Sequence, residues 1–175
     1  TDQLAPKLGA RVTVVPSDDG VGIDAERVAA AITERTKVVA ISHVLFRSAY
    51  IVDVAPIVAR ARAMGALVVL DAYHAVGVIP VDVRALGVDA YMGGVLKWLC
   101  GGPGGCFLWV RPELGETLAP VLTGWQAHAR PFGFEERFDA AHGAWRWLGG
   151  TPTVPALYAA LEGPRLVHEA GADAI

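Results

Sequence analysis

The apolar run Ala66-Leu67-Val68-Val69-Leu70-Asp71 decides the fold of this chain. An unbroken apolar stretch of this length is typical of a strand that is covered on both faces, as in a parallel sheet. A second run of the same kind occupies residues 37–42, and a segment long enough for a helix separates the two. Strand, helix and strand in this order predict a βαβ unit with a right-handed crossover.

The pattern extends outward from this unit in both directions. Further strands are expected at residues 11–16, 88–92 and 106–110. Helices are expected at residues 24–35 and 53–64 and from about Pro155. Asp24 and Asp53 are placed to cap the first two helices, and Gly65 to end the second. We therefore predict an α/β fold with three layers and a mostly parallel sheet.

Composition narrows the class of protein. The chain has 175 residues, of which 53% are hydrophobic and 19% charged, and this excludes a disordered chain. Its formal net charge of −3 and the lack of a basic block argue against nucleic acid or an anionic membrane as a partner. Cys100 and Cys106 are too few for a disulfide framework, so we expect a reducing, cytoplasmic compartment and two buried thiols.

Asp71 ends the most apolar strand, where ligands bind in open α/β sheets. One reading is that its carboxylate only caps the following turn. The other is that it faces a bound cation, because a buried carboxylate needs a partner. His74 follows three residues later and either faces the same crevice or is an ordinary loop residue.

Lys97 lies in the apolar, glycine-bracketed stretch from Gly93 to Gly105. A lysine in such a place is either a surface residue beside a turn or a chemically used amine. Apolar surroundings favour the neutral amine, which is the form that makes a Schiff base. The surrounding glycines allow the backbone to approach a flat ligand or a phosphate closely.

Taken together, Asp71 and Lys97 are the pair that pyridoxal phosphate requires. The lysine binds the aldehyde, and the aspartate keeps the pyridine nitrogen protonated so that the ring accepts electrons. The alternative is a non-catalytic α/β binding domain in which the two residues form a structural ion pair. The sequence suggests no metal site.

The stretch Val68-Val69-Leu70-Asp71-Ala72-Tyr73-His74-Ala75-Val76-Gly77, followed by Lys97-Trp98-Leu99 and its glycines, resembles fold-type I pyridoxal-phosphate enzymes of the class V aminotransferase group. Within that group the chain is most similar to kynureninases. Supporting pieces are Ser42-His43-Val44, Gly124-Trp125 and Gly150-Thr151-Pro152. The resemblance covers nearly the whole chain from about Val12.

The resemblance implies roles for single residues. Lys97 matches the lysine that binds the cofactor aldehyde and acts as the catalytic base, and Asp71 matches the partner of the pyridinium nitrogen. His74 falls near the phenolic oxygen of the cofactor. Trp125 matches a tryptophan that helps to hold the phosphate. Thr151 matches a polar residue that reaches the phosphate or substrate, often across a dimer interface.

The loop after residues 42–44 is expected to lie near substrate, with Ser48 and Arg47 as candidate contacts. Arg47 is placed to bind a substrate carboxylate. Two positions depart from the family pattern. Leu96 stands where kynureninases have a phosphate-binding tyrosine, and Leu45 stands where many relatives have a polar residue.

The implied reaction is the hydrolytic cleavage of the Cβ–Cγ bond of kynurenine to anthranilate and alanine. The alternatives within the group are an aminotransferase, a racemase or epimerase, and a cysteine desulfurase acting on a small amino acid. Residues 1–175 are expected to form part of the cofactor-binding large domain, without the group's N-terminal segment and C-terminal small domain. A homodimer with shared active sites is also implied.

Overall fold

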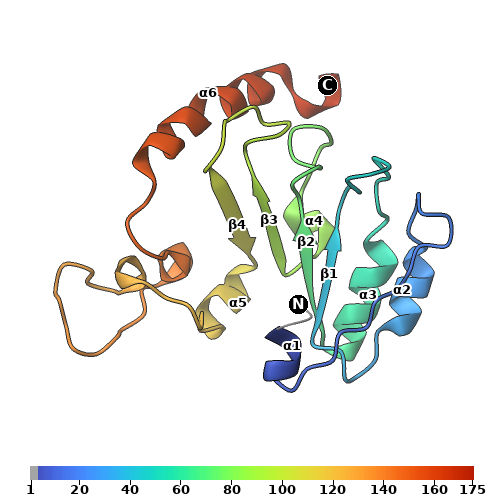
Figure 1. Ribbon diagram of the computed structural model, residues 1–175, viewed down its shortest axis with the longest axis horizontal. Coiled ribbons are helices and arrows are strands. Elements are labelled where there is room, and N and C mark those ends of the chain that lie inside the picture. The colour runs from blue at the N-terminus through green and yellow to red at the C-terminus, as the bar shows by residue number, and fades with distance from the viewer. Residues whose placement is uncertain (1–3) are drawn as a thin grey trace.

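The computed structural model describes residues 4–175. Its centre is a four-stranded sheet in the order β1-β2-β3-β4 (Figure 1). The strands are β1 (Val38–Ser42), β2 (Leu67–Asp71), β3 (Ala90–Gly94) and β4 (Cys106–Val110). The first three are parallel and β4 is antiparallel to β3, which confirms the predicted α/β class with a mostly parallel sheet.

Helices flank the sheet and extend past its end. The α-helices are α1 (Leu4–Lys7), α2 (Ala25–Ala31), α3 (Ala55–Met64), α4 (Val83–Leu86), α5 (Pro112–Thr117) and α6 (Val154–Ala170). Short 3-10 helices are η1 (Trp125–Ala127), η2 (Gly143–Trp147) and η3 (Ala172–Ala174). Figure 1 shows α2 and α3 side by side near β1, whereas α6 arches over the end of the sheet where β3 connects to β4.

Helix α3 ends as its sequence predicts, but its N-cap is Val54 rather than the predicted Asp53. The Asp53 carboxylate accepts a hydrogen bond from the Ala55 N–H at 3.1 Å, and Pro56 stands in the first turn, where a missing N–H is harmless. Gly65 ends the helix in the left-handed conformation, at φ 70°. The helix buries Ile57 completely, which contributes about 2 kcal/mol of hydrophobic stabilisation.

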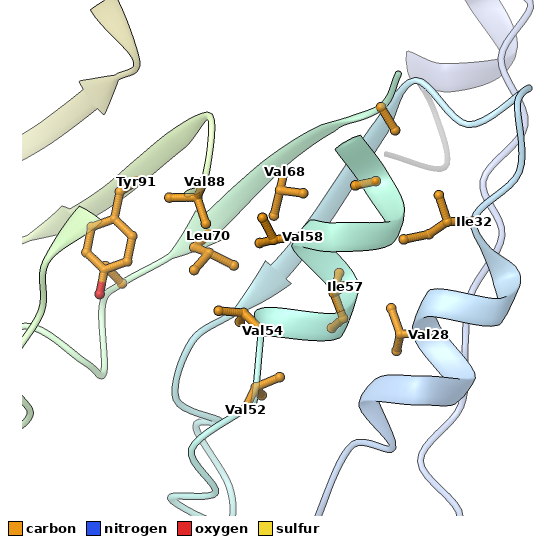
Figure 2. Packing of buried hydrophobic residues seen from close by; sticks show 13 residues of the cluster. Val28, Ile32, Val52, Val54, Ile57, Val58, Val68, Leu70, Val88 and Tyr91 are labelled. Atoms are coloured by element: carbon orange, nitrogen blue, oxygen red, sulfur yellow. The ribbon is translucent and has the colours of Figure 1, made fainter. Parts of the chain in front are cut away.

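The core lies between α3 and one face of the sheet (Figure 2). Val68, Leu70 and Tyr91 face inward from β2 and β3, and all three are at most 2% exposed. Helix α2 adds Val28 and Ile32 to the same cluster. The opposite face of the sheet is more open.

Three elements differ from their predicted bounds. Residues 11–16 are extended but form no strand in the described part of the chain, because they pair with no sheet edge. Helix α2 ends at Ala31 rather than 35, since Thr33 and Thr36 bond to nearby backbone N–H groups and offer the chain a turn instead. Strand β3 starts two residues later than expected, at Ala90.

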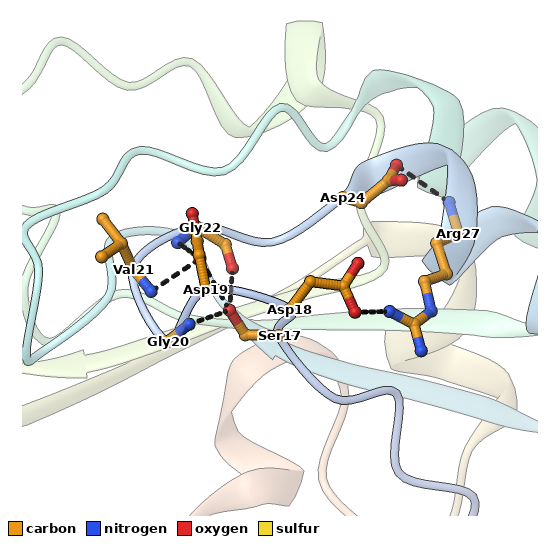
Figure 3. Close-up of polar contacts among 8 residues, drawn as sticks. All are labelled: Ser17, Asp18, Asp19, Gly20, Val21, Gly22, Asp24 and Arg27. Atoms are coloured by element: carbon orange, nitrogen blue, oxygen red, sulfur yellow. Dashed lines mark hydrogen bonds and ion pairs between the residues drawn. The ribbon is translucent and has the colours of Figure 1, made fainter.

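The turn before α2 is organised by aspartates (Figure 3). The Asp19 carboxylate accepts hydrogen bonds from the Val21 and Gly22 N–H groups at 2.8 and 2.9 Å. These bonds, to Gly22 first, hold the pKa of Asp19 below its usual value. Asp24 accepts from the Arg27 N–H at 3.1 Å, so the predicted cap of α2 is confirmed.

The structure also tests the expectation about the two cysteines. Cys100 and Cys106 are both exposed, so the prediction of buried thiols is wrong. Cys100 lies in a surface turn and Cys106 begins β4 on the open face of the sheet, where few side chains cover it. Within residues 4–175, no helix combines the length and the apolar character needed to cross a membrane.

Candidate functional site

Asp71 lies at the carboxyl end of β2, on the open face of the sheet. Its cross-strand partners are Ser42 of β1 and Met92 of β3, so it occupies the middle of the edge. The Asp71 carboxylate accepts a hydrogen bond from the Tyr73 N–H at 2.9 Å. It therefore caps the following turn, and yet its side chain stays exposed and available to a ligand.

Lys97 reaches the same edge from the connection between β3 and β4. Its Nζ atom lies 2.5 Å from Nε2 of His74, in the turn that follows Asp71. Both groups have N–H bonds or lone pairs suited to a hydrogen bond, and the two nitrogen atoms are within hydrogen-bond distance. The structure thus brings together two of the predicted residues, Lys97 and His74.

Two aromatic rings border the Lys97 amine. The Nζ atom lies 5.5 Å from the centroid of the Tyr73 ring and 5.8 Å from that of the Phe46 ring. Phe46 also lies 5.4 Å from the His74 ring, although 76% of Phe46 is exposed. Sequence reasoning missed Phe46. Its signal is a large apolar residue in a loop that follows a buried strand.

Arg47 and Ser48 continue the loop that carries Phe46. An antiparallel bridge between Val44 and Ile51 closes this loop. Arg47 is exposed, and the Ser48 hydroxyl accepts a hydrogen bond from the Tyr50 N–H at 3.3 Å. The loop lies beside the amine through Phe46, while Arg47 and Ser48 form no hydrogen bond with Lys97 among the described residues.

Asp71 and Lys97 share an edge without forming an ion pair in the described part of the chain. The structural ion pair of the non-catalytic alternative is therefore not formed. Asp71 still acts on its surroundings, because its charge is one cause of the raised pKa of Tyr73, after the Cys106 hydrogen bond and burial. The Lys97 amine and the Asp71 carboxylate therefore do not bind each other in the described part of the chain.

A buried polar pair lies beneath Asp71. His43 Nδ1 and the Tyr91 hydroxyl are 3.0 Å apart, and both residues are at most 5% exposed. Burial lowers the pKa of His43, whereas burial and then the Asp71 charge raise the pKa of Tyr91. The tyrosine therefore stays protonated and donates to a neutral imidazole. The backbone N–H of His43 donates a second hydrogen bond, to the backbone carbonyl of Asp71 at 2.9 Å.

Trp125 and Thr151 lie elsewhere. Both belong to the segment between α5 and α6, which Figure 1 shows in orange beside β4, on the side away from α2 and α3. The Gln126 N–H donates to the Gly149 carbonyl at 3.3 Å, so the two predicted positions are close to each other. Within residues 4–175, neither forms a hydrogen bond with Asp71, His74 or Lys97.

Comparisons with known proteins show which family the chain is similar to. The family model "Aminotransferase class-V" matches residues 1–175. An uncharacterized aminotransferase of Bacillus subtilis, YcbU, is 37% identical over 166 residues, which is 94% of this chain and 43% of YcbU. A kynureninase of Pseudomonas fluorescens is 36% identical over 133 residues, which is 75% of this chain and 32% of that protein.

The fold agrees with these sequence matches. A solved cysteine desulfurase of Thermococcus onnurineus aligns with a TM-score of 0.84 at 26% identity, over 98% of this chain and 42% of that one. The chain thus spans less than half the length of the relatives that it matches. With a family model that covers every residue, it belongs to the class-V aminotransferase family, whose members are pyridoxal-phosphate-dependent enzymes.

Proposed function

We propose that this chain is the cofactor-binding part of a kynureninase-like, pyridoxal-phosphate-dependent enzyme. The observation that carries the proposal is the position of the Lys97 amine, held by His74 at the edge where Asp71 ends β2. The identity to a kynureninase over most of the chain supports the proposed reaction, in which kynurenine is hydrolysed to anthranilate and alanine.

Bound pyridoxal phosphate supplies an electron sink, because its protonated pyridine ring delocalises the electron pair left at the substrate α-carbon. Asp71 is our candidate for pairing with the pyridine nitrogen. Its carboxylate is exposed at the edge of the sheet and forms no ion pair with a cation of the described chain. The Asp71 hydrogen bond to the Tyr73 N–H fixes the carboxylate in place before a ligand arrives.

Lys97 has two tasks in this proposal. Its amine would hold the cofactor aldehyde, and the same amine would be the base for the proton on the substrate α-carbon. His74 receives the Lys97 hydrogen bond and therefore orients the amine. The rings of Phe46 and Tyr73 border it on two sides.

The substrate end of the site is formed by the loop of Phe46. Arg47 is exposed there and is our candidate for the substrate carboxylate, with Ser48 beside it. A second function is amino transfer, favoured by the similarity to YcbU over 94% of this chain. Racemisation and desulfuration share the same amine and carboxylate, so products distinguish these reactions.

Trp125 and Thr151 support a homodimer with shared active sites. They lie on a segment away from Lys97, and we expect them to reach the cofactor phosphate in the site of a second copy. The same segment exposes large apolar side chains, including Phe132 at 74% and Phe134 at 84%. We also propose a cytoplasmic location, on the two free thiols Cys100 and Cys106.

The decisive experiment is borohydride reduction of the full-length protein with bound pyridoxal phosphate, followed by peptide mapping. We expect the label on Lys97, and a label on another lysine overturns the site assignment. Incubation with kynurenine then tests the reaction. Anthranilate and alanine support hydrolysis, whereas a keto acid and the pyridoxamine form of the cofactor indicate amino transfer instead.

A further inference from the structure

Lys97 stands in a tight turn between β3 and β4. The Gly101 N–H donates to the Val95 carbonyl at 2.7 Å, and the Cys100 N–H donates to the Lys97 carbonyl at 3.0 Å. Cys100 has a φ of 53°, which is uncommon for a residue other than glycine. A backbone in such a conformation persists only where its surroundings hold it. The neighbours of this turn therefore decide where the amine lies.

Gly77 holds the turn from one side. It follows His74 by three residues and has a φ of 85°. A Cβ atom at Gly77 would lie 2.9 Å from the Trp98 carbonyl oxygen and 3.2 Å from Cδ2 of Leu99. Only glycine allows this close approach, because carbon and a backbone oxygen do not pack at such a distance. The turn of His74 and the turn of Lys97 thus touch backbone to backbone.

Gly163 holds the turn from the other side. It is buried in the middle of α6, and a Cβ atom there would overlap the carbonyl oxygens of Leu99 and Cys100. The contact continues along the helix, because a Cβ atom at Gly104 would lie 2.8 Å from that of Ala156. Helix α6 therefore packs its small residues directly on the loop that follows Lys97, as its course in Figure 1 shows.

A glycine in a helix interior destabilises the helix by about 1 kcal/mol relative to alanine. Pro164 follows Gly163 and lacks the N–H that a helical residue donates. Both residues weaken α6 at the point where it meets the Lys97 turn. The close approach to the Leu99 and Cys100 carbonyls is the local contact that accounts for glycine at this position.

We propose that Gly77 and Gly163 are positioning residues that clamp the Lys97 turn between the His74 turn and α6, and so set the reach of the amine toward its cofactor. The proposal rests on the proposed function of Lys97. A side chain at either glycine shifts the turn and moves Nζ away from its bonding position, while the sheet and the core on α3 remain.

The test compares Gly163→Ala with Gly115→Ala in the full-length protein. Both glycines lie in helices, but a Cβ atom at Gly115 meets nothing within 4 Å. Pyridoxal phosphate is titrated while its visible absorbance is followed, the pH midpoint of that absorbance is measured, and Lys97 labelling by borohydride is quantified. Urea unfolding of each protein without cofactor reports stability separately.

We expect Gly163→Ala to weaken cofactor binding at least tenfold, to shift the pH midpoint and to lower Lys97 labelling, while Gly115→Ala matches the wild type. Equal binding, midpoint and labelling in the two variants would overturn the proposal and leave Lys97 as the cofactor lysine. A wild-type protein labelled on another lysine overturns the proposed function itself, so the two failures are distinguishable.

Ala160→Gly is the second variant for this test, in case Gly163→Ala does not fold. Ala160 lies on the same face of α6, and its Cβ atom is 3.0 Å from the position of a Cβ atom at Gly105. Removing this methyl group loosens the clamp without crowding it. We then expect faster hydrogen exchange at the Cys100 and Gly101 amides together with weaker cofactor binding, and unchanged values of both overturn the proposal.

Discussion

The Nζ atom of Lys97 lies 2.5 Å from Nε2 of His74, although 23 positions separate the two residues. The sheet explains the meeting. His74 follows β2 and Lys97 follows β3, and these strands are parallel neighbours whose carboxyl ends lie at one edge. Asp71 ends β2 at the same edge. Topology therefore assembles the candidate site before any side chain is considered.

Replacing the amine tests its role most directly. We expect Lys97→Ala to lower turnover by about a thousandfold or more, since it removes both the bond to the cofactor and the base. The change in visible absorbance that accompanies binding of pyridoxal phosphate to the lysine should disappear. Lys37→Ala is the matched control, because Lys37 is exposed and lies at the opposite end of β1. Equal loss in both variants would contradict the assignment.

Asp71→Asn separates charge from shape. The asparagine oxygen still accepts the hydrogen bond from the Tyr73 N–H, so we expect the fold and its melting temperature to be kept. Turnover should fall by about a hundredfold or more, because the positive charge on the ligand ring loses its partner. Steady-state kinetics and thermal unfolding of the same sample provide both measurements, and full turnover in the variant refutes the role of Asp71.

The core between α3 and the sheet should respond to truncation. Ile57 is fully buried, so Ile57→Ala is expected to reduce the free energy of unfolding by about 2–5 kcal/mol. Val38→Ala serves as the control, because Val38 is 54% exposed and should change stability by less than about 0.5 kcal/mol. Urea unfolding followed by circular dichroism measures both, and a similar loss in the two variants would place the core elsewhere.

Acid should destabilise the protein through His43. Burial lowers the folded-state pKa of His43 below its ordinary value of 6.5, so below pH 6.5 the unfolded chain binds the proton more readily. This contribution to stability is present above pH 6.5 and is lost as the pH falls toward the folded-state pKa, by at most about 1.4 kcal/mol per pH unit.

Unfolding free energies from pH 5 to 8 check this dependence on His43. We expect a shallower pH dependence in His43→Gln than in the wild type. His168→Gln is the control, since His168 is exposed on α6 and should leave the slope unchanged. A His43→Gln profile that runs parallel to the wild type would show that another group titrates.

Self-association is the last prediction. Phe134 is 84% exposed on the segment that carries Trp125 and Thr151. If this segment meets a second copy, Phe134→Asp buries a charge at the interface and should raise the dimer dissociation constant by about a hundredfold. Sedimentation velocity over a range of concentrations measures it, with Glu136→Ala on the same segment as control. A dimer of wild-type affinity in Phe134→Asp would remove the segment from the interface.

Sequence patterns were sufficient for the parts of the fold that depend on local chemistry. The buried run of β2, the Asp24 cap and the Gly65 end of α3 each follow from side chains near the element itself. The prediction of a strand at residues 11–16 was wrong because that element depends on more than its own residues. Its apolar residues suit a strand, but a strand also needs a partner edge, and no local pattern reveals one.

In the candidate site, too, features set by local residues were predicted and features set by distant contacts were not. Asp71 and Lys97 were found because their residue types stand out in apolar surroundings. Phe46, His43 and Tyr91 were missed, since their importance arises only when loops and strands distant in sequence come together. Periodicity and spacing do not predict contacts between residues that are distant in sequence. A glycine followed by proline inside the predicted last helix is the one local irregularity that marks the contact between α6 and the Lys97 turn.

The pairing of Gly94 with Cys106 has a consequence for how this protein tolerates insertions and deletions. The connection that carries Lys97 leaves and re-enters the sheet at one pair of partnered residues, and its turn packs on both the His74 turn and α6, so an added or lost residue disturbs these contacts. The exposed turn from Ser17 to Gly22 is held by hydrogen bonds within the turn itself and joins no two strands of the sheet. Length variation among descendants of this chain should therefore collect at that turn and spare the β3–β4 connection.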